Sequence, residues 1–290
     1  MDSSDYDSIT DAIAAVNDGG TVRMSAADIV TDTLSVSKSM TIAANGATFS
    51  APIKVTSGNV KIDGAKLVAS AASTAAKNNA PVISVTGDGD FALTNSTISG
   101  TSRTGVSLGT SGSITVEGNT FEASSKSIYN AIEFSIGDKA ADISKATVKG
   151  NTFTGTLGNN AISLYNLADG AEVNIEKNAF KDFSVESNCV RLSNPRNVSV
   201  TFNITDNSYG FTSETPSADG YTAFLLLQDY SKKDTPRQEF GKFTIHVKNL
   251  TRDGKKIAAK GDGIDKAYYV YSDQNGILSD GVNDPVIDFA

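Results

Sequence analysis

A glutamate and an arginine in the same column of a repeating pattern are the residues of this chain best suited to chemistry. Glu133 lies in "AIEF" and Arg191 in "CVRL", each between two apolar residues. A carboxylate can act as a general acid or base, and a guanidinium can hold an anionic substrate. In the sheet predicted below they are two strand spacings, about 10 Å, apart, so no direct ion pair is expected. Charges on a sheet face are usually solvated, which favours a non-catalytic interpretation of both.

The other candidates for catalysis or metal binding lack the partners that such sites need. His246 is the single histidine and lies in "KFTIHVKN", where no orienting partner can be identified. The turns "GDGD" at 87–90 and "GDGID" at 261–265 hold aspartates, but the further oxygen ligands and terminal glutamate of an EF-hand loop are missing. Cys189 is the only cysteine, which excludes a thiolate cluster. The sequence therefore predicts no metal and no cofactor.

Charge and composition argue against several classes of partner. The 290 residues carry a net charge of -8, with a pI near 4.7. No basic run is present to neutralise phosphates, so neither nucleic acid nor anionic lipid is expected to bind. No stretch is apolar over the roughly 18 residues of a membrane helix. The start, "MDSSDYDSIT", lacks the apolar core of a secretory signal. We expect a protein made without export, or an extracellular one if a signal has been removed.

A repeated octamer indicates the elements that position these residues. "ITVEGNTF" at 114–121 returns as "ATVKGNTF" at 146–153. Alignment on the last residue of the octamer gives one large apolar column, and a second column five residues earlier that begins with Ala44 and Ile62. Polar residues alternate with apolar ones before it, as in a strand with one buried face. The first column contains Phe49, Leu67, Ile98, Phe121, Phe153, Phe180 and Tyr209.

A second apolar strand repeats in step with the first. Its irregular spacing excludes a rigid short-period solenoid and fits coils that are fixed in register while their turns vary in length. The sequence therefore predicts an all-β fold, a single-stranded parallel β-helix of about nine coils. The inward pairs are Leu34/Val36, Ile53/Val55, Ile83/Val85, Val106/Leu108, Ile132/Phe134, Ile162/Leu164, Val190/Leu192, Phe224/Leu226 and Tyr268/Val270.

Stacking explains the recurrence of "GNTF" without any chemistry. Asn119, Asn151, Asn178 and Asn207 share the position where the strand bends into a turn. Asparagine tolerates the left-handed backbone conformation and can bond its own backbone there. Side-chain amides stacked about 4.8 Å apart would bond along the column. We expect a structural asparagine ladder beside a stacked aromatic column.

The ends of a β-helix need caps, because open strand edges attract other chains. In "DSITDAIAAVNDGG" one helical face is formed by Ile9, Ala12, Ile13 and Val16. Asp7 or Ser8 can be the N-cap, and Gly19-Gly20 can end the helix. An amphipathic helix at 1–20 would therefore cover the first coil.

With the "GGTV" that follows this helix, the chain resembles the pectate-lyase-like superfamily of right-handed β-helices, an architecture also found in phage tailspike, fibre and decoration proteins. The resemblance implies a right-handed coil. We expect one structural domain, with a capping helix at 1–20, the β-helix at 21–272 and a C-terminal cap or docking segment at 273–290.

The polysaccharide-cutting members of this superfamily have catalytic motifs that the chain does not match. A polygalacturonase-like site would show Asn-Thr-Asp, Asp-Asp and Gly-His-Gly, whereas Asp-Asp is absent and His246 is not flanked by glycines. A pectate-lyase-like site would show Arg-x-Pro-x-x-Arg, and the nearest match, "RLSNPR" at 191–196, has the wrong spacing. Glu133 and Arg191 remain as the alternative catalytic residues.

The column on the outward face of the second strand becomes apolar at its last two members. It runs through Ser35, Lys54, Ser84, Ser107, Glu133, Ser163, Arg191, Leu225 and Tyr269. A solvent-facing sheet should not be apolar, so we expect Leu225 and Tyr269 to be a covered interface. The cover would be the segment 273–290 of the same chain, or another subunit or partner protein.

Two classes of function remain. The missing catalytic motifs and missing export signal favour a non-enzymatic structural or attachment component of a virus particle, above all of a phage, such as a capsid decoration, head-fibre or tail protein. Its partners would be other virion proteins or its own subunits. The alternative is a polysaccharide lyase, a glycoside hydrolase or a non-catalytic carbohydrate-binding adhesin. The absence of Trp, which sugar grooves use for stacking, counts against that alternative.

Overall fold

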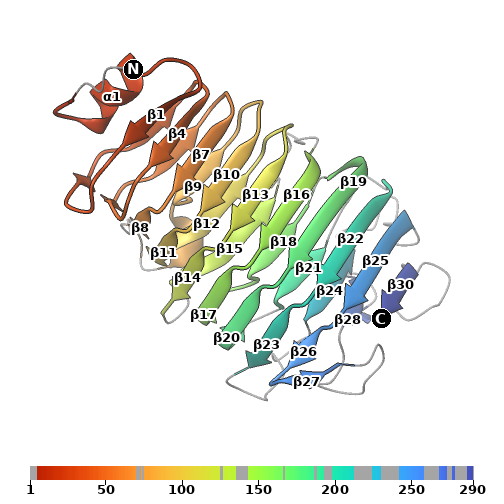
Figure 1. Cartoon of the computed structure of the whole chain (residues 1–290). Helices are drawn as coiled ribbons and strands as arrows, with labels where there is room; N and C mark the ends of the chain where they lie inside the picture. Colours follow the sequence, from red (N-terminus) through yellow and green to blue (C-terminus); the bar gives the residue numbers. More distant parts are fainter. Residues whose placement is uncertain are drawn as a thin grey trace.

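The computed structural model shows parallel sheets along almost the whole chain and one short α-helix at the N-terminus (Figure 1). It describes residues 5–69, 73, 75–124, 127–134, 143–165, 167–185, 188–192, 198–211, 224–229, 242–257, 268–272, 276–277 and 286–289. Three sheets of ten strands each run along the molecule, and successive coils add one strand to each sheet. The predicted all-β parallel β-helix is confirmed. No helix in these described residues has the length and apolarity to cross a membrane.

The first sheet contains parallel strands only. In spatial order they are β1 (Gly20–Arg23), β4 (Met40–Ala43), β7 (Val60–Asp63), β10 (Phe91–Thr94), β13 (Ile114–Glu117), β16 (Ile143–Lys149), β19 (Leu167–Glu176), β22 (Val200–Thr205), β25 (Phe243–Lys248) and β30 (Val286–Phe289).

The second sheet begins where the asparagine turns end, and its last strand pairs antiparallel. Its strands are β2 (Ile29–Val30), β5 (Thr48–Phe49), β8 (Lys66–Ala69), β11 (Thr97–Gly100), β14 (Thr120–Ala123), β17 (Thr152–Leu157), β20 (Ala179–Val185), β23 (Ser208–Phe211), β26 (Thr251–Arg252) and β27 (Lys255–Lys256).

The third sheet carries the column that holds the charged candidates, and it also ends in an antiparallel strand. Its strands are β3 (Leu34–Val36), β6 (Ile53–Val55), β9 (Ile83–Val85), β12 (Ser102–Leu108), β15 (Ile128–Phe134), β18 (Ile162–Leu164), β21 (Val190–Leu192), β24 (Leu225–Asp229), β28 (Tyr268–Ser272) and β29 (Gly276–Ile277).

The registers of the third sheet confirm the inward pairs from Leu34/Val36 to Val190/Leu192. At β24 the prediction is wrong by one residue, because Val190 pairs with Leu225 and Arg191 pairs with Leu226. A shift of one residue exchanges the two faces of a strand. The run "AFLLL" is apolar at every position, so its pattern could not distinguish the inward residues from the outward one.

The second coil, which begins with β4, also departs from the predicted alignment. Ile42 pairs with Ile62, so the expected pairing of Ala44 with Ile62 is wrong by two residues. The turn after β4 is longer, and it contains Asn45 and Gly46, both at positive φ (49° and 89°). Because the shift is even, the inward face of the strand is unchanged.

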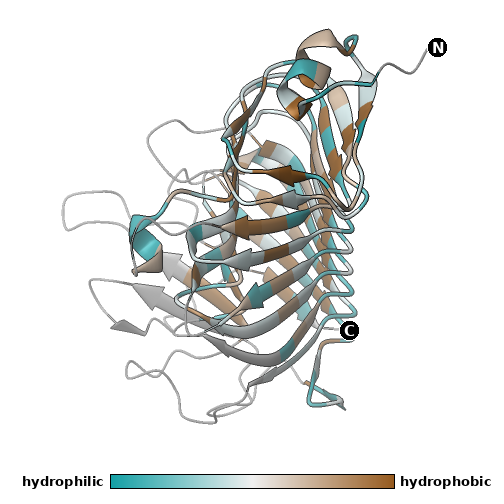
Figure 2. Cartoon of the chain, turned by 90° about the vertical axis from the view of Figure 1, so that its left-hand side faces the viewer, coloured by the Kyte–Doolittle hydropathy of each residue, from teal (hydrophilic) through white to brown (hydrophobic). Residues whose placement is uncertain are grey.

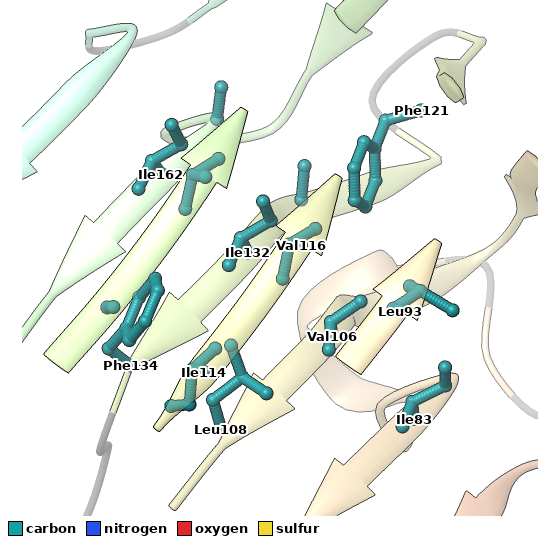
Figure 3. Packing of buried hydrophobic residues seen from close by; sticks show 14 of the residues in the cluster. Ile83, Leu93, Val106, Leu108, Ile114, Val116, Phe121, Ile132, Phe134 and Ile162 are labelled. Carbon is teal, nitrogen blue, oxygen red and sulfur yellow. The ribbon is translucent and has the colours of Figure 1, made fainter. Parts of the chain in front are cut away.

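Side chains from all three sheets meet in one continuous core. Figure 3 shows Val116 of the first sheet, Phe121 of the second and Ile132 of the third in this packing. The predicted aromatic column is stacked: the ring centroids of Phe121 and Phe153 are 5.0 Å apart, and those of Phe153 and Phe180 are 4.7 Å apart. Burial of such rings contributes more than their area alone.

The asparagine column forms a hydrogen-bonded ladder. Nδ2 of Asn119 donates to Oδ1 of Asn151, and the same bond joins Asn151 to Asn178 and Asn178 to Asn207, each at 3.0 Å. Each accepting Oδ1 also receives the backbone N–H of the asparagine before it. Each Nδ2 donates to a backbone carbonyl of the preceding coil. Every side-chain amide of this ladder is therefore paired, as burial requires.

The left-handed residue of these turns is the one before the asparagine. Gly118, Gly150, Lys177 and Asp206 have φ between 53° and 68°, whereas the ladder asparagines are not at positive φ. The expectation that asparagine takes this conformation is therefore wrong. The left-handed residue lies between a strand of the first sheet and a strand of the second, and the asparagine that follows it is buried.

The α-helix α1 (Ile9–Ala15) covers the N-terminal end (Figure 2). Oγ of Ser8 accepts the N–H of Asp11, so Ser8 is the N-cap. Ile13 is buried, and Ile9, Ala12 and Val16 pack against the core, as the predicted face requires. The helix ends at Ala15, before Gly19-Gly20, which lead into β1.

At the other end, described residues of 273–290 return to the sheets. β29 pairs antiparallel with β28, and β30 pairs parallel with β25.

The ladder predicts a large and position-specific loss of stability. In Asn151→Ala, the backbone N–H and Nδ2 of Asn119 and the carbonyl of Val116 lose their buried partner, which should cost about 3 kcal/mol in unfolding free energy. Asn174→Ala is the matched control, since Asn174 lies half-buried on the outer face, accepts one bond from Asn203 and donates one exposed bond to Glu172; about 1 kcal/mol is expected. Urea denaturation measures both, and equal losses would contradict the ladder's role.

Asp63 predicts a pH-dependent contribution. The hydrogen bond from the Thr94 hydroxyl lowers the pKa of Asp63, with help from Asn95 and Lys61 and against the effect of burial. A carboxyl group whose pKa is lower in the folded than in the unfolded chain stabilises the folded state at pH values above its unfolded pKa. This stabilisation is lost as the pH falls through its folded pKa. Thr94→Val should cost about 1 kcal/mol at pH 6, and less below pH 4. Urea denaturation from pH 3 to 7 tests this, and a pH-independent difference would contradict it.

Candidate functional site

The charged candidates lie on the outer face of the third sheet. Glu133 in β15 pairs with Ser163 in β18, and Ser163 pairs with Arg191 in β21. The side chain of Glu133 is 2% exposed and that of Arg191 is 6% exposed. The expectation that these charges are solvated is wrong. The outer face is covered here by the chain itself, which an alternating strand pattern cannot reveal.

A short helical turn lies against this face. The 3-10 helix η1 (Ala76–Asn78) contacts β12 and β15. Asn79 closes the turn, because its Nδ2 donates to the Ser73 carbonyl and its Oδ1 accepts the Ser73 N–H, both at 2.8 Å. Arg103 of β12 donates from Nη1 to the Lys77 carbonyl at 3.5 Å. This turn connects to the polar cluster through Arg103.

Glu133 is held from several sides. Its Oε2 accepts the Thr104 hydroxyl at 2.6 Å, and its Oε1 accepts Nδ2 of Asn130 at 2.9 Å. Nη2 of Arg103 lies 3.8 Å from Oε1, and the Arg103 side chain is 39% exposed. A buried carboxylate is tolerated when its oxygens are paired in this way. The arrangement stabilises the carboxylate and gives it no open path to a substrate.

Arg191 contacts neutral groups among the described residues. Its Nη2 donates to Oγ of Ser163 at 2.6 Å, and its guanidinium lies over the ring of Tyr165, 5.1 Å from the centroid. A cation over an aromatic face is favourable, more so when both are removed from water. Ser163 stands between Glu133 and Arg191 in register, in agreement with the prediction that the two charges make no direct pair.

A second asparagine column supports this cluster, and the sequence analysis missed it. The N–H of Asn160 donates to Oδ1 of Asn130 at 3.1 Å, and the N–H of Asn188 donates to Oδ1 of Asn160 at 3.2 Å. All three side chains are buried. The signal in the sequence is the tetrad "NAIE" at 130–133, "NAIS" at 160–163 and "NCVR" at 188–191.

The second position of these tetrads is a small residue in each coil. Ala131, Ala161 and Cys189 occupy it, and all three are fully buried. At Gly105, in the preceding coil, a Cβ atom would come within 2.7 Å of the Ala131 carbonyl oxygen, so glycine is required there. Burial raises the pKa of the Cys189 thiol, which makes it a packing residue rather than a nucleophile.

The remaining candidates lie elsewhere and do not converge. His246 is in β25 of the first sheet, with Nδ1 3.7 Å from Oδ2 of Asp288 in β30, and both side chains are exposed. Asp88 and Asp90 accept turn hydrogen bonds from Ser111 and Ser113. Asp262 and Asp265 lie outside the described residues. Within the described part of the chain, no group of three or more His, Cys, Asp or Glu side chains could hold a metal.

Leu225 and Tyr269, the two expected C-terminal interface residues, do not lie in the same column of the third sheet. Leu225 faces the core, so its assignment to the outward column is wrong. Leu226 takes that place and is 4% exposed, which means that the chain covers it without a second subunit. The backbone of Tyr269 pairs with Leu226, and its side chain lies outside the described part.

Comparison with known proteins gives one match. A family model described as a right-handed beta helix region matches residues 62–219, more than half of the chain. The matched range contains both asparagine columns together with Glu133 and Arg191. No curated protein and no solved structure matches.

The cluster predicts that Glu133 is needed for stability. In Glu133→Gln, one carboxylate oxygen becomes an amide donor that faces the Thr104 hydroxyl or the Asn130 amide, so about 2 kcal/mol of unfolding free energy should be lost. Glu117→Gln is the matched control, because Glu117 is 47% exposed and lies 3.6 Å from Lys149; less than about 0.5 kcal/mol is expected. Chemical denaturation distinguishes the two, and a silent Glu133→Gln variant would contradict the buried-carboxylate assignment.

Proposed function

Because this chain belongs to the right-handed β-helix family, we propose that it is a non-enzymatic structural or attachment component of a virus particle, such as a capsid decoration, head-fibre or tail protein of a phage. The observation that supports a non-enzymatic role is the burial of Glu133 and Arg191, the two residues that remained as catalytic candidates. A general acid or base must reach the proton that it transfers. Here Glu133 is held by Thr104 and Asn130 instead.

The number of carboxylates on this face supports the same proposal. Hydrolysis of a glycosidic bond uses two carboxyl groups about 5–10 Å apart, one on each side of the bond. In the outward column from Ser35 to Leu226, Glu133 is the one carboxylate. Its neighbours in that column are Ser107 and Ser163.

The construction of the fold suits a rigid structural component. Three sheets of ten strands, an asparagine ladder and stacked rings hold successive coils in one register. Such a rod keeps its shape without a partner and presents long sheet faces at fixed spacing. The choice of a virus particle rests on the architectural resemblance to β-helical phage proteins, and is an argument by analogy.

The C-terminal end is the surface that we propose for docking. β30 is the last strand of the first sheet, and its Val286 side chain is 61% exposed. An edge strand with an apolar side chain is suited to pair with another chain. The partner would be another virion protein or a second copy of this chain.

The test is mass spectrometry of purified particles from the source, followed by rebinding of the recombinant chain to particles that lack it. We expect stoichiometric presence and cosedimentation. Val286→Asp should weaken rebinding at least tenfold, about 1.4 kcal/mol. Ile29→Asp is the control, because Ile29 is similarly exposed (69%) at the opposite end, and it should not weaken rebinding.

Absence from particles would overturn the proposal. Cleavage of acidic or neutral polysaccharides by the wild type but not by Glu133→Gln would establish the enzymatic alternative. Binding of such a polysaccharide without cleavage, by a chain absent from particles, would establish the adhesin.

A further inference from the structure

The last strand of the first sheet is attached along one edge. β30 pairs with β25 from Thr244–Val286 to Val247–Phe289, and it ends the order of strands in the described sheet (Figure 1). Of its described side chains, Val286 and Asp288 are exposed, and Ile287 packs partly buried against the core. A terminal strand of this kind opens locally more readily than a strand inside a sheet.

An ion pair joins the outer faces of these two strands. His246 of β25 and Asp288 of β30 are directly opposite in register, with Nδ1 3.7 Å from Oδ2. The two side chains are 48% and 67% exposed. The attraction depends on protonation of the ring, because a neutral imidazole has no charge to offer the carboxylate.

The other groups beside this imidazole do not replace Asp288. On β22 the neighbour of His246 is Asn203, a neutral amide whose Nδ2 donates to Oδ1 of Asn174 at 2.8 Å. On β25 itself, Lys248 lies two residues further along the same outer face and has the same sign of charge as an imidazolium. Among the residues of β22, β25 and β30, Asp288 is therefore the one carboxylate that faces the ring.

This histidine is well suited to respond to pH. Histidine is the side chain whose charge ordinarily changes between about pH 5 and pH 8, and His246 is the single histidine of the chain. The one cysteine, Cys189, does not titrate there, because burial raises the pKa of its thiol well above its usual value. A change in the attachment of β30 within this pH range can therefore be assigned to His246.

We propose that protonated His246 holds β30 on β25 through Asp288, which makes the attachment of this terminal strand pH-sensitive. At pH values below the histidine range the ion pair is complete and its contribution is fully present. As the pH rises through that range the ring loses its charge and the contribution is lost. Val286 lies on the same strand, so the pair also regulates the docking surface. This last consequence rests on the proposed function, whereas the attachment itself does not.

Amide hydrogen exchange of the full chain tests the proposal, read by mass spectrometry on the peptide that contains Val286–Phe289. It is measured at about pH 5.5 and about pH 8, and corrected for the intrinsic exchange rate. An exposed ion pair contributes little, so we expect about threefold more protection at the lower pH. Asp288→Asn and His246→Gln should each remove this difference. A peptide from β13, inside the same sheet, should show none.

Asp253→Asn is the matched control. Asp253 is 65% exposed and lies 3.6 Å from Nε of Arg252, in the turn that follows β26. This variant should keep the difference seen in the wild type. Equal protection of β30 at both pH values in the wild type would overturn the proposal, as would a difference that persists in Asp288→Asn. Should a variant not fold, the wild type in about 0.5 M sodium chloride decides, because salt screens an exposed pair; an undiminished difference there would also overturn the proposal.

The exchange measurement separates this proposal from the proposed function, because it uses the chain without particles. Protection that does not change with pH refutes the role of His246 and leaves the particle assignment standing. Absence of the chain from particles refutes that assignment and leaves the attachment of β30 standing. Where the chain rebinds to particles, rebinding should be about threefold tighter at the lower pH, and Asp288→Asn should abolish that dependence.

Discussion

The structure depends on one constraint: a polar group that is buried between coils needs a hydrogen-bond partner. The ladder from Asn119 to Asn207 meets this constraint, because the amide oxygens of Asn151, Asn178 and Asn207 each receive two donors from the coil before. A buried amide left unpaired is costly, so the coils cannot slip relative to one another. The stacked rings of Phe121, Phe153 and Phe180 follow from the same register. The turns on the outside can vary in length because none of these bonds passes through them.

The same constraint accounts for the charged residues of the third sheet. The Nδ2 group of Asn130 is buried and needs a hydrogen-bond acceptor, and Oε1 of Glu133 accepts its bond. A charge that pairs with the scaffold in this way is fixed and removed from water, whereas a catalytic carboxylate needs access to a substrate. Access to solvent therefore distinguishes a stabilising polar column from an active site. Both can consist of the same residue types on the same kind of sheet.

Most periodic features were predicted from the sequence, although the column of Asn130, Asn160 and Asn188 was missed. The inward columns and the ladder follow from repeated residue types, and the capping helix follows from its apolar face. At Leu225 an unbroken apolar run leaves two registers equally good, and in the second coil the longer turn at Asn45-Gly46 is not revealed by an alignment on Phe49. The burial of Glu133 and Arg191 depends on segments that fold over the outer face, and no strand pattern contains that information.

The tetrads show where such a scaffold can acquire specificity. The first three residues of each tetrad are buried. The asparagine is constrained by its bond to the adjacent coil, and the second and third residues are constrained by packing in the core. The fourth position meets none of these demands, and it is Glu133, Ser163 or Arg191 in successive coils. Glutamate satisfies the corner amide from within, serine does not reach it, and arginine brings a charge to the coil before it. One position of the repeat therefore varies in charge and length, while the asparagine bonds that join the coils stay the same.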